Sequence, residues 1–211
     1  GGVVDKNKLK EELSNYEIKM TSKERAKAYF NGEKVDHLPF NIMSLDLVYG
    51  MNMGYSLKET EDVDKLIKII EKRTEEYKIY GIAEGLNLRA MGYALGSTGI
   101  FPENDTDHVD HYLMEDELNI DLLEVPDPYN NELLKKKLDN ARKLREHFPD
   151  HPISTFVAGP MSTAVAIRPI SKLLRDLRKN PDGVKGLLDF CVKANMAWAK
   201  AFKKEFGPVK I

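Results

Sequence analysis

Several features that would narrow the class of this protein are missing from its 211-residue sequence. There is one cysteine, Cys191, which excludes an internal disulfide framework and is typical of a reducing compartment. No apolar run approaches the ~20 residues that a membrane helix requires. The first residues also lack the basic and then apolar pattern of a secretory signal. We therefore expect a cytoplasmic protein with no membrane partner.

The sequence also has no excess of charge of either sign. It contains 32 lysines and arginines against 34 aspartates and glutamates. A protein that mainly binds nucleic acid usually needs a basic surface, so we expect no nucleic-acid partner. Hydrophobic residues make up 42% and charged residues 31%, a composition typical of globular proteins. The length fits one domain, alone or with an extension.

Hydrophobic periodicity and capping signals predict helices that alternate with short apolar strands. Thr21 and Glu24 have the spacing of a capping box, and the helix that they begin should end at Asn31-Gly32. Cys191 falls on the apolar face of the last predicted helix, where we expect it to be buried. The other expected helices cover 61–80, 134–148, 170–179 and the residues from Pro181 onward, and the expected strands cover 38–43, 81–91 and 152–159.

The alternation of strands and helices predicts parallel βαβ units. Right-handed crossovers leave an open doubly wound sheet or a (β/α)8 TIM-type barrel. A barrel typically needs ~250 residues, and three strands are too few to close one. In the barrel interpretation, residues 21–211 form a partial barrel domain, roughly its first half, and residues 1–20 form a helical extension or a cloning remnant. The polar segment 96–128 is too long for an ordinary connection, so we expect it to be functional or locally structured.

Polar side chains near the ends of the predicted strands are the candidate binding residues. Asn41 and Asp46 lie near the end of the first strand. Arg89 lies in the second, where a buried charge needs a partner. Glu84 is a candidate for that partner, and the alternative is that Arg89 binds an anionic substrate group.

Two hydroxyl side chains, Ser162 and Thr163, follow the third predicted strand. One interpretation is that they cap the next helix. The other is that they line a cavity, because the loops after barrel strands face the active site. No base lies beside them in the sequence, so we expect them to position a ligand rather than attack it.

The segment from Asp105 to His111 is rich in aspartate and histidine, which makes a metal site conceivable. The mix matches no established ligand spacing, so a surface loop or lid is the preferred interpretation. The methionines near the first two strands favour adaptable core packing, with a flat apolar wall for a ligand as the alternative. These methionines are Met43, Met51, Met53 and Met91.

Three motifs occur in order along the chain and together resemble one family. "MTSKERAKAYFNGEKVDHLPF" matches an opening of the form T-x-K-E-R followed by G-E-x-x-D-R-x-P, with His37 in place of the usual arginine. "LLEVPDP" at 122–128 matches L-x-x-P-D-P, and "VAGPMSTAVAIR" with "LLRDLRKNPDGVKGLLDFC" matches a glycine-proline segment and the helices after it. Over most of residues 20–206 the chain resembles the uroporphyrinogen decarboxylase superfamily.

The resemblance implies one of two activities. Decarboxylases of this superfamily carry an arginine-rich R-Q-A-G-R-Y segment after the first strand, which grips substrate carboxylates. Here the matching segment is "NIMSLDLVYGMNMGYS", without arginine. The resemblance therefore favours the corrinoid-dependent methyltransferases, similar to methylcobalamin:coenzyme M methyltransferases of one-carbon metabolism. Such a protein moves a methyl group between a corrinoid protein and a small thiol or folate acceptor. The alternatives are a uroporphyrinogen decarboxylase of porphyrin biosynthesis and a non-catalytic half-barrel binding or assembly module.

The resemblance also implies cofactors and partners. The methyltransferases hold zinc with a His-x-Cys pair and a distant cysteine, and the zinc activates the acceptor thiol. This sequence has no His-x-Cys pair, so we expect zinc in the full-length family with ligands outside this chain, and catalytic residues stay unassigned. Methylcobalamin would be a substrate or be carried by a corrinoid protein, and the methionines would form a wall for the corrin face. A half-barrel exposes apolar edges, which makes a homo-oligomer possible.

Overall fold

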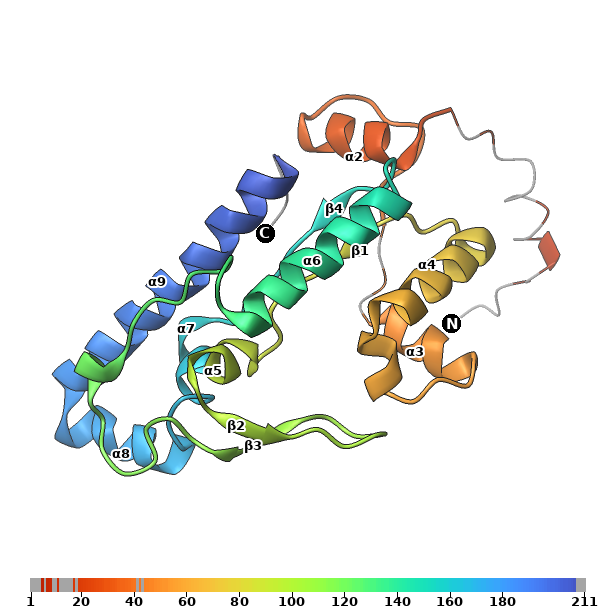
Figure 1. The fold of residues 1–211 in the computed structure, drawn as a ribbon. Coiled ribbons are helices and arrows are strands. Elements are labelled where there is room, and N and C mark those ends of the chain that lie inside the picture. Colours follow the sequence, from red (N-terminus) through yellow and green to blue (C-terminus); the bar gives the residue numbers. More distant parts are fainter. Residues whose placement is uncertain are drawn as a thin grey trace. The chain divides into compact units, whose positions relative to one another are not determined.

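The computed structural model describes residues 5, 7, 8, 11, 17, 19–40, 42 and 44–207. Its contacts divide the chain into two units, Gly1–Asn41 and Ile42–Ile211, which we describe separately. Figure 1 shows the course of the chain. Most of the predicted extension over 1–20, as well as Asn41 and Met43, lies outside the described residues. The predicted division after residue 20 stays a prediction.

The first unit contains the predicted helix, α2 (Ser22–Phe30), and its capping box. Thr21 N donates to Glu24 Oε2 at 2.8 Å, and Glu24 N donates to Thr21 Oγ1 at 3.2 Å. The helix is followed by Asn31 and by Gly32, whose φ of 73° favours glycine. Both predicted ends are therefore confirmed.

A buried ion pair joins α2 to the residues that follow it. Arg25 Nε donates to Asp36 Oδ1 at 2.6 Å, and Arg25 Nη2 donates to Asp36 Oδ2 at 2.9 Å. The Asp36 carboxylate also accepts the backbone N–H groups of Met20 and His37. These hydrogen bonds, that from Arg25 above all, hold the pKa of Asp36 far below its ordinary value. The motif residues Arg25 and Asp36 thus stabilise the local structure.

The sequence predicted a first strand over 38–43, and this prediction is wrong for the residues that are described there. Residues 38–40 and 42 are irregular, and a helix begins at Leu45. Pro39 has no N–H to donate to a sheet ladder, which disfavours a strand at this place. The second unit contains these elements in order: α3 (Leu45–Asn52), η1 (Lys58–Glu61), α4 (Val63–Tyr77), β1 (Ile82–Ala83), α5 (Ala90–Leu95), β2 (Thr98–Ile100), β3 (His108–His111), η2 (Ile120–Leu122), α6 (Glu132–His147), β4 (Ile153–Ser154), α7 (Pro160–Ala164), α8 (Ile170–Lys179) and α9 (Pro181–Phe206).

The strands β1 and β4 form a two-stranded parallel sheet in which Ile82 pairs with Ile153. The ladder continues beyond both strands, because Leu86 N donates to Phe156 O at 2.9 Å. Parallel pairing of the second and third predicted strands is confirmed, although both strands are shorter than expected. The chain is thus a helix-rich α/β protein with a small parallel sheet.

Two long helices, α6 and α9, bury one face of this sheet (Figure 1). The main core is apolar and includes Ile82, Leu86, Ile153, Leu134, Leu138, Leu144, Ala194, Trp198 and Phe202. The Trp198 indole is fully buried and donates from Nε1 to Thr155 Oγ1 at 2.9 Å. The opposite face carries Ala83, which is exposed, and Phe156, which is 50% exposed. Parallel sheets are usually covered on both faces, so this sheet has one face without a cover among the described residues.

A second apolar cluster lies around Cys191, which is fully buried as predicted. Burial raises the pKa of the Cys191 thiol to about 12. Val184, Leu187 and Leu173 pack in the same cluster. The thiol is therefore neutral at physiological pH and behaves as a small hydrophobic side chain.

The long polar segment is locally structured, because it contains the antiparallel hairpin of β2 and β3. At the base, Ser97 Oγ donates to Ala166 O at 2.8 Å and accepts Leu113 N at 3.1 Å. Near the tip, Lys58 N donates to Glu103 O at 3.0 Å. Both ends of the hairpin are thus attached to other elements. Among the described residues, no helix has the length and apolar character needed to cross a membrane.

The contact between Trp198 and Thr155 can be tested by the substitution Thr155→Val. The variant keeps the side-chain shape but leaves a buried indole N–H without an acceptor, which should lower the free energy of unfolding by about 1–3 kcal/mol. Urea unfolding followed by the fluorescence of Trp198, the one tryptophan of the sequence, measures this. Thr106→Val, the same substitution at an exposed threonine, is the control, and equal urea midpoints for the two variants would contradict the assignment.

The ion pair in the first unit predicts a pH dependence. Because the folded-state pKa of Asp36 is depressed, its stabilising effect is complete above the ordinary aspartate pKa of about 3.9 and is lost as the pH falls toward the folded value. Asp36→Asn should remove about 3 kcal/mol of local stability at neutral pH. Amide hydrogen exchange of Met20 and His37 reports this loss, with Glu33→Gln as the control. Unchanged protection in Asp36→Asn would show that the pair does not hold this segment.

Candidate functional site

Two adjoining cavities lie where the chain leaves the carboxyl end of the β1 ladder. One has a volume of about 290 Å³ and the other of about 360 Å³. They share five lining residues, namely Lys58, Glu61, Asn87, Phe101 and Asp107. Ligands of parallel α/β folds bind at the carboxyl ends of the strands, so this pair of cavities is the candidate site.

Asn87 turns the chain from the β1 ladder into α5. Its side-chain Oδ1 accepts the backbone N–H of Arg89 at 3.1 Å and that of Ala90 at 2.9 Å. Asparagine suits this turn because its side chain bonds to the backbone two residues on. Since Oδ1 accepts both bonds, the orientation of the amide is determined and Nδ2 remains as a donor. Among the described residues Nδ2 has no hydrogen-bond partner, and Asn87 lines both cavities.

The sequence predicted that Arg89 lies in a strand. In the structure it lies directly before α5. Its partner is Asp107 of the hairpin and not Glu84. Nε donates to Asp107 Oδ2 at 2.8 Å, and Nη2 donates to Oδ1 at 3.0 Å. The Tyr93 hydroxyl adds a third hydrogen bond to Asp107 at 2.8 Å. Burial raises the pKa of Asp107, but the hydrogen bonds from Arg89 and Tyr93 outweigh burial and hold that pKa below its ordinary value.

Glu84 lies on the covered face of the sheet, two residues before the ladder ends. It accepts from Lys137 Nζ at 2.9 Å and from Asn140 Nδ2 at 3.3 Å, both on α6. Successive residues of a strand point to opposite faces. This alternation explains why Glu84 reaches α6 and is not available to Arg89.

Asp46, another predicted binding residue, is held in an ion pair. Its Oδ1 accepts from Arg73 Nε at 2.6 Å, and Arg73 is 2% exposed. Arg73 Nη2 also donates to Gly81 O at 2.6 Å. Asp46 does not line either cavity, although its neighbour Leu47 lines the cavity of about 290 Å³. The structure therefore gives Asp46 a supporting position between α3 and the segment that leads into β1.

Ser162 and Thr163 lie in α7, and the expected capping role is wrong. Gly159 is the N-cap of α7, with no side-chain hydrogen bond to the cap. Thr163 is fully buried and accepts from Asn195 Nδ2 at 3.1 Å, while Asn195 also donates to Ala158 O at 3.0 Å. Ser162 is half-buried, and neither hydroxyl lines the candidate site. Thr163 thus attaches the segment after β4 to α9.

The groove beside this segment, with a volume of about 720 Å³, is a separate feature. It is lined by the loop after β4 and by α9, including Gly159, Asn195 and Met196. Neither Ser162 nor Thr163 lines it.

The described residues do not fit a zinc site. In the segment 105–111, Asp107 is bound to Arg89, and Asp110 accepts from Thr98 Oγ1 at 2.7 Å. Nowhere in the described ranges do three histidine, cysteine, aspartate or glutamate side chains gather as metal ligands would. Cys191 is buried among apolar side chains and its raised pKa disfavours the thiolate that zinc requires.

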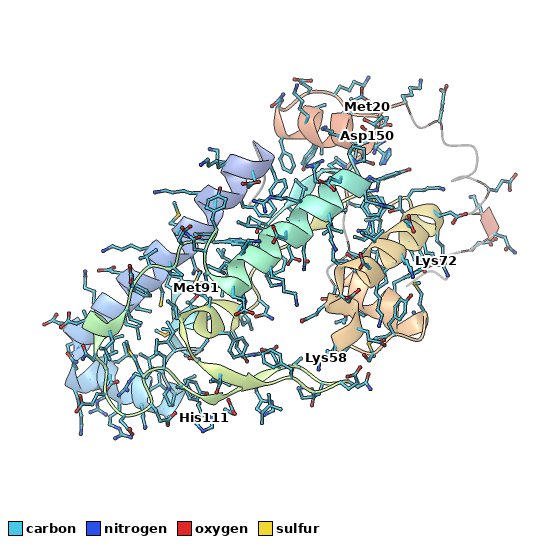
Figure 2. The ribbon with its side chains drawn as sticks, viewed as in Figure 1. Met20, Lys58, Lys72, Met91, His111 and Asp150 are labelled. Atoms are coloured by element: carbon cyan, nitrogen blue, oxygen red, sulfur yellow. The ribbon has the colours of Figure 1, made fainter. Side chains whose placement is uncertain are left out.

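The described methionines of this set, Met51, Met53 and Met91, do not form one wall. Met91, a residue of α5, is 2% exposed and packs in the main core with residues of α9 (Figure 2). Met51 is exposed on α3, and Met53 follows the same helix. Core packing is thus the role of Met91.

The candidate site can bind and orient a small polar ligand. Lys58 and Arg89 bring positive charge to the first cavity, and Glu61, Asp105 and Asp107 bring negative charge. Sequence reasoning found Arg89 but missed Asn87 and Lys58. A signal for Asn87 was present, since asparagine directly after an apolar run is typical of a turn. Lys58 carried no such signal.

Comparison with known proteins places this geometry in a family. A solved structure of a methyltransferase from Methanosarcina mazei is similar, with a TM-score of 0.70 and 20% sequence identity. The match covers 91% of this chain and 58% of that chain, so this chain spans under two thirds of the similar structure. No curated protein sequence matches the chain. The model of the family described as uroporphyrinogen decarboxylase (URO-D) matches residues 21–207. The chain belongs to the uroporphyrinogen decarboxylase family.

Proposed function

We propose that this chain is part of a corrinoid-dependent methyltransferase. It would move a methyl group between methylcobalamin, carried by a corrinoid protein, and a small thiol or folate acceptor in cytoplasmic one-carbon metabolism. The observation that carries the proposal is the chemistry of the segment 44–56. It contains no arginine, and its acidic residue Asp46 is bound to Arg73.

The same observation disfavours decarboxylation of a porphyrinogen. Such a substrate carries many carboxylates, which arginine binds best because its planar group donates two parallel hydrogen bonds. The candidate cavities contain one arginine, Arg89, and Asp107 already occupies its Nε and Nη2 donors. The carboxylates of Glu61 and Asp105 would also repel a polyanion.

We further propose that the chain forms part of a (β/α)8 barrel. The parallel ladder between β1 and β4 supports this, as does the sheet face at Ala83 and Phe156 that no described element covers. Because the described residues do not fit a zinc site, we propose that the predicted site residues bind the ligand or support the site and do not coordinate a metal. Arg89 would contact the ligand, Asp46 would support the site through Arg73, and Ser162 and Thr163 would position the segment after β4.

The uncovered sheet face also favours a second candidate, a non-catalytic half-barrel module that docks on a partner. Exposed apolar sheet surface promotes association. Light scattering on the chain, first alone and then mixed with a corrinoid protein, tests this candidate. A monomer that binds neither a corrinoid protein nor a second copy would count against it.

Methyl transfer is tested with the full-length gene product, zinc, methylcobalamin and a series of thiols and folates. We expect the cobalamin absorbance spectrum to change as the methyl group leaves. Arg89→Gln should raise the KM for the acceptor, whereas Arg175→Gln, on the exposed surface of α8, should leave it unchanged. No spectral change with any acceptor would refute the proposal. Decarboxylation of uroporphyrinogen would instead support the other activity of the family.

A further inference from the structure

We propose that Asn87, Arg89 and Lys58 form a binding site for a small monovalent oxyanion, a carboxylate or a sulfonate. All three residues line the cavity of about 290 Å³ at the carboxyl end of the β1 ladder. Each presents a hydrogen-bond donor that has no partner among the described residues. The ligand is therefore a small molecule whose anionic end accepts from all three groups.

The first donor is the side-chain amide of Asn87. Its Oδ1 is held by the N–H groups of Arg89 and Ala90, so the amide cannot rotate to present its oxygen to the cavity without losing both bonds. An amide that presents only N–H groups selects a ligand that accepts hydrogen bonds.

The second donor is Arg89 Nη1. The hydrogen bonds to Asp107 use Nε and Nη2, which leaves Nη1 without a partner within the described ranges. Asp107 also fixes the plane of the guanidinium, since Nε and Nη2 donate two parallel hydrogen bonds to its carboxylate. Arg89 therefore presents an oriented donor and loses little side-chain freedom when a ligand binds.

The third donor is the ammonium group of Lys58. Its backbone N–H is bound to Glu103 O at 3.0 Å, which holds the start of η1 against the hairpin. The ammonium group has no ion-pair or hydrogen-bond partner in the part of the chain that is described. Figure 2 shows Lys58 at the end of the α3–α4 region that faces the hairpin, with Lys72 farther along α4. Lys58 thus supplies charge from across the cavity.

The acidic side chains of the cavity restrict the charge of the ligand. Glu61 and Asp105 line the same cavity, and Asp107 offsets the charge of Arg89. A dianion such as phosphate meets more repulsion here than a monoanion does. The apolar part of the wall, which includes Leu57, Leu88 and Phe101, suits the hydrocarbon portion of a small organic acid.

This inference concerns binding and does not depend on methyl transfer. If the cobalamin assay fails and an anion still binds at Asn87, the site stands and the proposed reaction does not. If an acceptor is methylated and no anion binds there, the opposite holds.

The site is tested by two-dimensional NMR titration of the 211-residue chain with propionate, methanesulfonate and inorganic phosphate in separate experiments. We expect propionate or methanesulfonate to shift the signals of Asn87, Arg89 and Lys58, and to bind at least three-fold more tightly than phosphate. The two monoanions identify which source of the oxyanion the cavity prefers. Equal affinity for all three, or shifts confined to the lysines of α9, would overturn the proposal.

Asn87→Asp is the decisive variant, because aspartate can accept the same two backbone hydrogen bonds but replaces the donor with a negative charge. We expect binding to weaken at least ten-fold. Asn119→Asp is the matched control, since Asn119 accepts from Asp121 N at 3.1 Å in a similar exposed turn outside both cavities. Wild-type affinity in Asn87→Asp, or an equal loss in both variants, would refute the site.

Lys58→Gln gives an independent test that does not depend on how the turn at Asn87 folds. The exposed Lys58 side chain makes no hydrogen bond or ion pair with the described residues, so the variant should fold normally. We expect its affinity for the preferred anion to fall at least three-fold. Lys72→Gln, an exposed lysine of α4, should bind as the wild type does. Identical affinities for these two variants would contradict the role of Lys58.

Discussion

The buried guanidinium of Arg73 holds together the two sides of the candidate site. It binds Asp46 of α3 and the carbonyl oxygens of Ile79 and Gly81, which lead into β1. A buried arginine is tolerated only when its charge and its donors are satisfied. The loss of any one of these contacts would therefore destabilise the others. α3 continues into η1 with Lys58, and β1 continues to Asn87. The distance between Lys58 and Asn87 across the cavity therefore depends on Arg73, which forms a hydrogen bond with neither of them.

The order of helices and strands could be predicted because hydrophobic periodicity is a local property. The helix α8 (Ile170–Lys179) has its predicted bounds, and α4, which Asp62 caps, begins two residues after the predicted start at residue 61. Strand lengths could not be predicted in the same way. The apolar run 81–91 contains Gly85, whose missing side chain allows the backbone of Phe156 to approach, and Asn87, which ends the ladder. The run 81–91 thus contains a short strand, β1, and the start of a helix, α5.

Partners of charged residues are harder to predict than elements, because they depend on contacts between remote segments. Glu84 was the nearest acid to Arg89 in the sequence, but strand alternation directs Glu84 toward α6. Asp107 was one of several acids in a polar segment, and only the hairpin brings it to Arg89. Likewise the pair Arg25–Asp36 was visible as part of a family motif, while its structural role required the geometry. The hydrogen bond that Thr163 accepts from Asn195 of α9 likewise joins segments that are far apart in the sequence.

The hairpin and the sheet differ in how much chain must be ordered before they form. Arg89 and Asp107 are 18 residues apart, whereas Ser154 and Ile82, which a hydrogen bond joins across the parallel ladder, are 72 residues apart. The entropy lost on closing a loop grows with its length, and contacts between distant residues slow folding. We expect the Arg89 donor to be oriented early, by neighbours in the sequence, and the parallel ladder to close later. The orientation of Arg89 thus depends on a short stretch of chain, whereas the parallel sheet requires contacts between distant residues.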